Sequence, residues 1–175
     1  MLSPDTVWNG SKEFEFTIHG RSDLDYAGNT DDRRSVSGGR VFLNGAPVTF
    51  RSATQKSVTL LVTEAEGSAR VVVAQDMLYV YPLLQSIGLK VKLGMILEMD
   101  NKGAVNLANN WSLEGRTRHV NVKNHFLQEL KDEGLMVIRH VAGDDNDADI
   151  FTKNTMAAIF AKHIPNFFGV DEYME

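Results

Sequence analysis

The sequence predicts a mixed α/β domain, and three observations lead to this fold class. Residues 13–18, EFEFTI, alternate polar and apolar side chains with the period of a β-strand. Two apolar runs are joined by Asn44-Gly45, the pair that a type I′ hairpin turn favours. Residues 63–87 favour a helix with one apolar stripe, and strands and helices alternate after it, as they do in α/β domains.

The later elements follow in chain order. Pro82 lies inside the long helical stretch, where it would bend or divide the helix, and Gly88 is a suitable stop. The run ILEMDNKGAV indicates an apolar strand that ends at Asp100 and continues directly into a helix. Further along we expect a helix in 119–134, a strand in 135–141 in which His140 packs, and a helical segment in 147–164, in one or two pieces. This order predicts a mixed sheet of about five strands, of which the first three are antiparallel.

Composition limits the class of protein. The chain has 175 residues, of which 43% are hydrophobic, enough for one domain with a core. It has no cysteine, which excludes disulfides and thiolate metal sites. No apolar run approaches the roughly 20 residues of a membrane span, and the N-terminus lacks the regions of a signal peptide, so we expect an intracellular chain without a membrane partner. The net charge of −5 argues mildly against a nucleic-acid partner, although cations cluster locally, for example at Arg33-Arg34.

Four carboxylates stand at the ends of predicted elements. They are Asp23 in an early strand, Glu66 in the first turn of the long helix, Asp100 at a strand tip and Asp149 in the first turn of the last helix. In α/β sheets, sites form outside strand ends and at helix starts. Converging acids repel one another unless cations intervene, and hard oxygen ligands suit Mg²⁺. Two such ions about 3.5–4 Å apart would serve phosphodiester hydrolysis.

The same carboxylates also have purely structural interpretations. These are a capping box of Thr63 with Glu66, an N-cap at Asp100, a helix-dipole charge at Asp149, and solvated turn positions for Asp23 and Asp25. Caps are much commoner than metal sites, so spacing alone leaves the metal site and the structural roles equally supported.

Several motifs occur in one order along the chain. They are SDLDYAG with the hairpin and TEAE that follow it, then MDNKGAVNLANN, GRTRHVNVKNHFLQELKDEG and ADIFTK. Together they resemble the RNase H domain of Ty1/copia-type retrotransposon polyproteins, which lies downstream of the reverse transcriptase. The match spans about residues 13–165. We therefore expect an RNase H-like domain in 13–175, and in 1–12 the tail of an upstream connection segment or a flexible N-terminus.

The resemblance implies a five-stranded RNase H-like sheet flanked by helices, and cleavage of the RNA strand of RNA–DNA hybrids with two Mg²⁺ or Mn²⁺ ions. By position, it assigns both the catalytic and the metal-binding role to Asp23, Glu66, Asp100 and Asp149. Asp25 is an alternative to Asp23, because residues at i and i+2 share a strand face. Candidates for substrate contacts are Ser22, Asn101, Arg116, Arg118 and Lys153, although solvated surface charge explains the cations equally well.

The resemblance also implies an adjoining reverse transcriptase domain, and a location in a cytoplasmic retrotransposon particle or in the nucleus. Two positions depart from the family pattern. Gly67 stands where a bulky residue, usually tyrosine, follows TEAE, and Arg40 stands where an aromatic or aliphatic residue follows Gly39. These departures leave open a degenerate or domesticated module that binds nucleic acid or acts as a scaffold without catalysis. Integrases and junction resolvases share the fold, but TEAE in the first long helix argues against an integrase.

Overall fold

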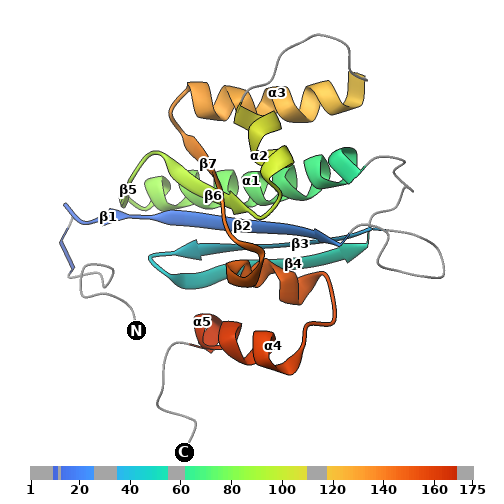
Figure 1. Ribbon diagram of the computed structural model, residues 1–175. Helices are drawn as coiled ribbons and strands as arrows, with labels where there is room; N and C mark the ends of the chain where they lie inside the picture. The colour runs from blue at the N-terminus through green and yellow to red at the C-terminus, as the bar shows by residue number, and fades with distance from the viewer. Residues whose placement is uncertain (1–9, 12, 26–34, 55–61, 110–117, 169–175) are drawn as a thin grey trace, which may run out of the picture.

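The computed structural model describes residues 10–11, 13–25, 35–54, 62–109 and 118–168 (Figure 1). Its elements are β1 (Glu15–Phe16), β2 (Ile18–Asp25), β3 (Val36–Leu43), β4 (Ala46–Thr54), α1 (Val62–Ser86), β5 (Lys90–Val91), β6 (Met95–Met99), α2 (Lys102–Asn109), α3 (Arg118–Asp132), β7 (Met136–His140), the 3₁₀ helices η2 (Gly143–Asp145) and η3 (Asp147–Phe151), α4 (Ala157–His163) and α5 (Pro165–Phe168). Most of 1–12, the expected upstream tail, lies outside the described residues.

The main sheet has five strands in the order β4-β3-β2-β6-β7. Strands β2, β3 and β4 are antiparallel neighbours, whereas β2 pairs with β6, and β6 with β7, in parallel. This confirms the predicted five-stranded mixed sheet with three antiparallel strands first. The first of these strands is β2, however, and not the expected 13–18, where only Glu15–Phe16 form the short strand β1 outside this sheet. A separate parallel pair of short strands, β1 with β5, extends the structure beside the C-terminal end of α1.

The predicted hairpin joins β3 to β4. Leu43 pairs with Ala46, and Asn44 and Gly45 between them have φ angles of 51° and 83°, as a type I′ turn requires. The Asn44 side chain accepts a hydrogen bond of 2.7 Å from the Thr17 backbone N–H, which ties the turn to the start of β2. The Asn44-Gly45 prediction is therefore confirmed.

Helices cover both faces of the sheet (Figure 1). Helix α1 lies on one face with α2 and α3 beyond it, and η3, α4 and α5 lie on the other. Two adjacent glycines in β3 let both layers approach closely. A Cβ at Gly39 would lie 2.2 Å from Val73 of α1, and one at Gly38 would lie 2.5 Å from Thr152, just after η3. Any larger side chain at either position would push a layer away from the sheet.

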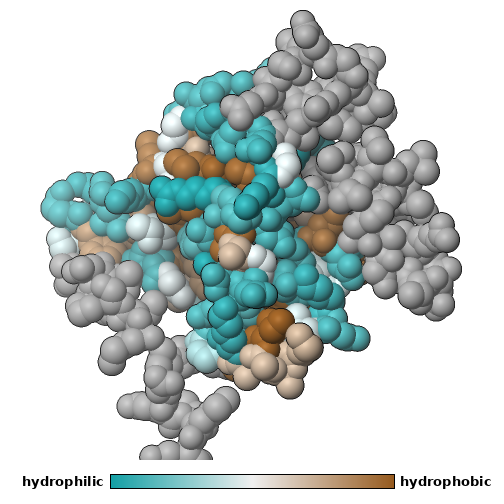
Figure 2. Space-filling view, in the orientation of Figure 1, coloured by the Kyte–Doolittle hydropathy of each residue, from teal (hydrophilic) through white to brown (hydrophobic). Residues whose placement is uncertain are grey.

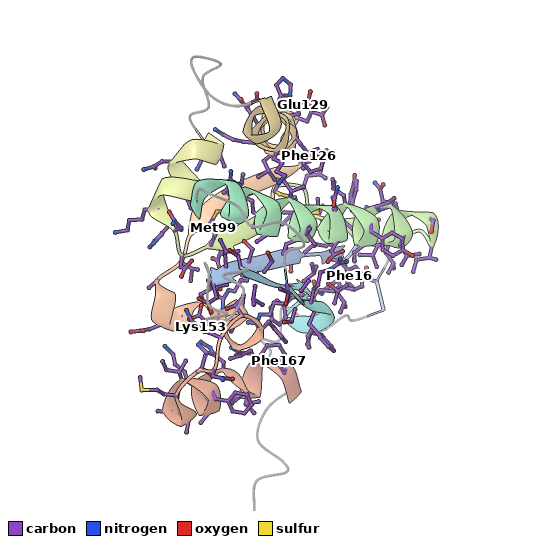
Figure 3. All side chains as sticks on the ribbon, turned by 90° about the vertical axis from the view of Figure 1, so that its right-hand side faces the viewer. Phe16, Met99, Phe126, Glu129, Lys153 and Phe167 are labelled. Carbon is purple, nitrogen blue, oxygen red and sulfur yellow. The ribbon has the colours of Figure 1, made fainter. Side chains whose placement is uncertain are left out.

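The apolar core lies between the sheet and α1. The predicted stripe of α1 is buried there, and α1 runs unbroken through Pro82. The buried side chains include Val73, Met77, Val80 and Leu84 of α1 with Val41, Leu97 and Met99 of the sheet. Figure 3 places Met99 and Phe126 on this side of the sheet, and Lys153 and Phe167 on the other.

Two sequence expectations need correction. The segment 147–164 is helical in separate pieces, as one form of the prediction allowed, but Asp149 was expected in the first turn of the last helix and lies instead in the 3₁₀ helix η3, which precedes α4 and α5. His140, expected to pack, is exposed at the end of β7.

No helix in the described part of the chain is long and apolar enough to cross a membrane. Hydrophilic side chains cover much of the described face in Figure 2, and apolar groups are visible near α4 and between α3 and the sheet. Met156 and Phe160 are among the exposed large hydrophobic residues.

Candidate active site

Three carboxylates converge where the parallel strands end. Strands β2 and β6 pair with Ser22 opposite Met99, so the next residues, Asp23 and Asp100, lie side by side. The 3₁₀ helix η3 crosses beneath this point and contributes Asp149. One carboxylate oxygen from each of the three acids lies within 4.8 Å of the others. Asp23 is 4% exposed and Asp149 is 7% exposed, so two of the acids are charged groups placed in the interior.

Short contacts hold η3 against the sheet at this point. The Thr152 hydroxyl is hydrogen-bonded to the Asp23 carboxylate and lies 3.0 Å from the Asp149 carbonyl oxygen. Asn146, which is fully buried, donates through Nδ2 to the Ser22 carbonyl at 3.2 Å. Its Oδ1 accepts a longer hydrogen bond of 3.4 Å from the Ala148 N–H, as the N-cap of η3. These side chains link the segment that carries Asp149 to the strand that carries Asp23.

The two carboxylate oxygens of Asp149 lie in different environments. Its Oδ2 lies 2.7 Å from the Lys153 ammonium nitrogen. Its Oδ1 is buried and has no hydrogen-bond partner among the described residues. Burial is the largest influence on this carboxyl, and the charge of Asp23 adds to it against the opposing effect of Lys153, so that the pKa of Asp149 is raised to about 6.

The ionised form of the Asp100 carboxyl is also disfavoured. Burial raises its pKa, and the charge of Asp23 raises it further. The residue is not the N-cap of the following helix, because Asn101 accepts the Ala104 N–H at 3.0 Å and so caps α2. The N-cap interpretation of Asp100 is therefore wrong. Asn101, expected near the substrate, has a clear structural role.

A cleft of about 220 Å³ opens beside Asp23 and Asp100. Ser22 lines it from β2, and Ala69 and Arg70 line it from α1. Glu66 lies in the first part of α1, and the structure describes its backbone but not its side chain. Its backbone position is three and four residues before Ala69 and Arg70, which places it on the same helix face as the cleft-lining residues.

The other candidate residues have different placements. Asp25 is half-buried and lies outside the three-acid cluster, beside a neighbouring pocket that Lys153 also lines. Arg116 lies outside the described residues. Arg118 is the first residue of α3, and its side chain is not described. Lys153 is 44% exposed at the edge of the acid cluster.

Sequence reasoning missed three side chains at this site. Arg70 is 1% exposed and its Nη1 donates to the Ala104 carbonyl at 3.0 Å, which joins α1 to the start of α2. Its i+4 spacing from Glu66 was the available signal. Asn146 and Thr152 flank Asp149 by three residues on either side, and nothing in their local pattern distinguishes them from ordinary turn residues.

A buried ion-pair network lies behind η3 on the same face of the sheet. Asp147 is fully buried and pairs with Arg21 at 2.6 Å and with Arg40. Arg21 also pairs with Glu98 at 2.9 Å, and Asn166 donates to Asp147 at 3.2 Å. Arg40, the residue that departs from the family pattern, is thus neutralised by a carboxylate two residues before Asp149.

The arrangement of sheet and helices is that of the RNases H. LC11-RNase H1, isolated from compost, superposes with a TM-score of 0.59 at 16% identity, covering 78% of this chain and 92% of that one. The same enzyme in complex with an RNA/DNA hybrid also gives 0.59 at 16% identity, covering 78% of this chain and 94% of that one. The N-terminal RNase H domain of rv2228c from Mycobacterium tuberculosis gives 0.54 at 14% identity, covering 83% and 99% of the two chains. At these identities the likeness shows the fold.

The sequence relatives are retrotransposon Pol polyproteins. The Pol polyprotein from transposon TNT 1-94 of Nicotiana tabacum is 31% identical over 136 residues, which is 78% of this chain and 10% of that protein. The Pol polyprotein from transposon RE2 of Arabidopsis thaliana is 31% identical over 137 residues, or 78% and 9% of the two chains. No protein-family model matches the chain. The chain is thus homologous to Ty1/copia retrotransposon Pol polyproteins over 78% of its length, and it spans about a tenth of the length of these relatives.

Proposed function

We propose that this chain is a ribonuclease H that hydrolyses the RNA strand of RNA–DNA hybrids endonucleolytically, with two Mg²⁺ or Mn²⁺ ions. The convergence of Asp23, Asp100 and Asp149 within 4.8 Å carries this proposal. The fold supports it, because LC11-RNase H1 shares the fold and forms a complex with an RNA/DNA hybrid.

The residues present fit a divalent metal site. Carboxylate oxygens are the hard ligands that Mg²⁺ prefers, and three of them meet here from separate elements. The buried Oδ1 of Asp149 lacks a hydrogen-bond partner among the described residues, a costly arrangement that a cation would relieve. Burial and mutual repulsion raise the pKa of Asp100 and Asp149, so the acids alone are poorly compensated.

In the proposed enzyme, these three acids hold the ions, and Glu66 adds a fourth carboxylate from the cleft-facing side of α1. When bound, two such ions activate a water and stabilise the leaving oxygen. The chain's own contribution is rigid placement. Asp23 and Asp100 sit on paired central strands, and the Thr152 hydroxyl holds the Asp23 carboxylate in position. Rigid placement of the ligands matters because small displacements of reacting groups are expensive in rate.

Recognition of the hybrid would be based on shape. A protein distinguishes RNA from DNA by 2′-hydroxyls and groove width, read mainly through backbone contacts. Because the 18 Lys and Arg residues of this chain are outnumbered by 23 Asp and Glu residues, its overall charge disfavours phosphate binding, and we propose that an adjoining reverse transcriptase domain holds the hybrid in the natural polyprotein.

The decisive experiment incubates the full chain with a hybrid labelled on its RNA strand, with and without Mg²⁺ or Mn²⁺. We expect internal cleavage of the RNA strand that requires the metal, and no cleavage of a DNA duplex of the same sequence. Asp100→Asn is the control, because it keeps the size of the side chain and removes a metal ligand. Hybrid binding without any cleavage by the wild-type chain would overturn the proposal in favour of a non-catalytic binding or scaffold module.

A further inference from the structure

Lys153 lies over the acid cluster. Its Nζ is 2.7 Å from Asp149 Oδ2, an oxygen of a proposed metal ligand. The backbone sets this contact, because the N–H groups of Thr152 and Lys153 both donate to the Asp149 carbonyl at 3.1 Å and so turn the chain back over Asp149. Figure 3 shows Lys153 on the side of the sheet that carries η3 and the C-terminal helices.

The ammonium contacts Asp149, and the charges of all three carboxylates act on it. Burial by itself would lower the pKa of Lys153, but its hydrogen bond to Asp149 and the charges of Asp23, Asp149 and Asp100 raise it above the ordinary value. In return, the charge of Lys153 opposes the upward shifts in the pKa of Asp100 and Asp149. Lys153 therefore offsets part of the repulsion within the cluster.

We infer that Lys153 is the internal counter-ion of the acid cluster, and that it competes with divalent metal for the carboxylates. This inference rests on the proposed function. An ammonium in contact with Asp149 Oδ2 uses an electron pair that a metal ion would take, and its charge repels a dication at the same carboxylates. A metal ion on Oδ2, or on both oxygens of Asp149, must therefore displace the lysine head, which its 44% exposure permits because the flexible side chain can turn into solvent. A metal ion on Oδ1 alone would still be repelled by the ammonium charge on the same carboxylate.

This role differs in sign from a phosphate contact. If Lys153 served only to bind substrate phosphates, removing its charge would weaken hybrid binding and leave metal affinity unchanged. As an internal counter-ion, its removal destabilises the metal-free protein and strengthens metal binding. The two roles are thus separable without measuring cleavage.

The test compares Mg²⁺ binding by the full-length wild-type chain, Lys153→Gln and Lys153→Arg, using titration calorimetry and melting temperature at low ionic strength. Lys162→Gln is a matched control, because Lys162 also forms a 2.7 Å ion pair, with Asp145, and is 50% exposed, but it pairs outside the acid cluster. We expect Lys153→Gln to lower the metal-free melting temperature and to bind Mg²⁺ roughly three- to tenfold more tightly. Lys153→Arg and Lys162→Gln should bind Mg²⁺ like the wild type.

The possible results separate the two proposals. Equal or weaker Mg²⁺ binding by Lys153→Gln, with clear binding by the wild type, overturns the counter-ion inference and leaves the ribonuclease proposal standing. Absence of Mg²⁺ binding in every variant overturns both. Binding detectable only in Lys153→Gln would support the competition in its strongest form.

Discussion

The ion pair between Asp147 and Arg40 makes a quantitative prediction about stability. Asp147 is fully buried and receives hydrogen bonds or ion pairs from Arg21, Arg40 and Asn166. Arg40 is 2% exposed, and its guanidinium carbon lies 3.8 Å and 4.5 Å from the ring centroids of Phe42 and Phe167. Replacing Asp147 with asparagine keeps its size but leaves two guanidinium groups facing each other without the carboxylate between them.

The two single substitutions should have unequal costs. Asp147→Asn leaves Arg40 as an uncompensated buried charge, which typically costs about 3–5 kcal/mol of the free energy of unfolding. Arg40→Met should cost less, about 1–3 kcal/mol, because Asp147 keeps Arg21 and Asn166 as partners. The double variant Arg40→Met with Asp147→Leu should recover most of the loss, since an apolar pair of similar volume often replaces a buried ion pair at little cost.

Urea unfolding followed by circular dichroism measures these differences, provided that the dependence on urea concentration stays the same among variants. Asp76→Asn is the control. It breaks the 3.0 Å ion pair between Asp76 of α1 and Arg51 of β4, in which the arginine is 54% exposed, and exposed ion pairs contribute little to stability. A cost below about 1 kcal/mol for Asp147→Asn, or a double variant no more stable than Asp147→Asn, would refute the reasoning.

The ion pair of Arg40 with Asp147 is also relevant to the alternative that this chain is a degenerate domain without catalysis. Arg40 departs from the resemblance at a position where an aromatic or aliphatic residue is usual, and a buried arginine without a partner would indicate decay. The structure instead supplies Asp147 as its counter-charge. The charge of Arg40 is thus compensated locally, although its Nε and Nη1 have no hydrogen-bond partner among the described residues.

Three further outcomes are expected. Asp23→Asn should abolish hybrid cleavage while Asp25→Asn retains it, because Asp25 lies outside the three-acid cluster; equal loss in both would reopen the choice between them. The raised pKa of Asp149 contributes stability to the metal-free protein that is fully present below the ordinary pKa and is lost as pH rises through about 6, whereas the lowered pKa values of His19 and His163 act in the opposite direction. The stability difference between the wild type and Asp149→Asn, from denaturant titrations, should therefore shift in favour of the wild type as pH falls from about 6 towards 4, and a difference that does not depend on pH would contradict it. The chain alone should bind hybrid weakly, with a shallow fall of log K against log salt in fluorescence anisotropy, and nanomolar binding at physiological salt would contradict the small number of phosphate contacts.

Local signals in the sequence determined most of the elements. Asn44-Gly45 specifies the β3–β4 turn because its two residues tolerate the positive φ angles that the turn requires. The apolar stripe of α1 and the alternation in the strands depend on periodicities of a few residues, so they can be recognised without knowledge of the fold. The acidic positions at element ends were visible for the same reason.

Only the tertiary structure decided which of these acids meet. Asp23, Asp100 and Asp149 are separated by more than 40 residues along the chain, and the parallel register of β2 with β6 and the seating of η3 on β3 bring them within 4.8 Å. Local pattern likewise could not tell that Asn101 rather than its neighbour caps α2, or that Asp147 would neutralise Arg40. These outcomes depend on which faces pack together and which charges lose their water, and both are properties of contacts between distant segments.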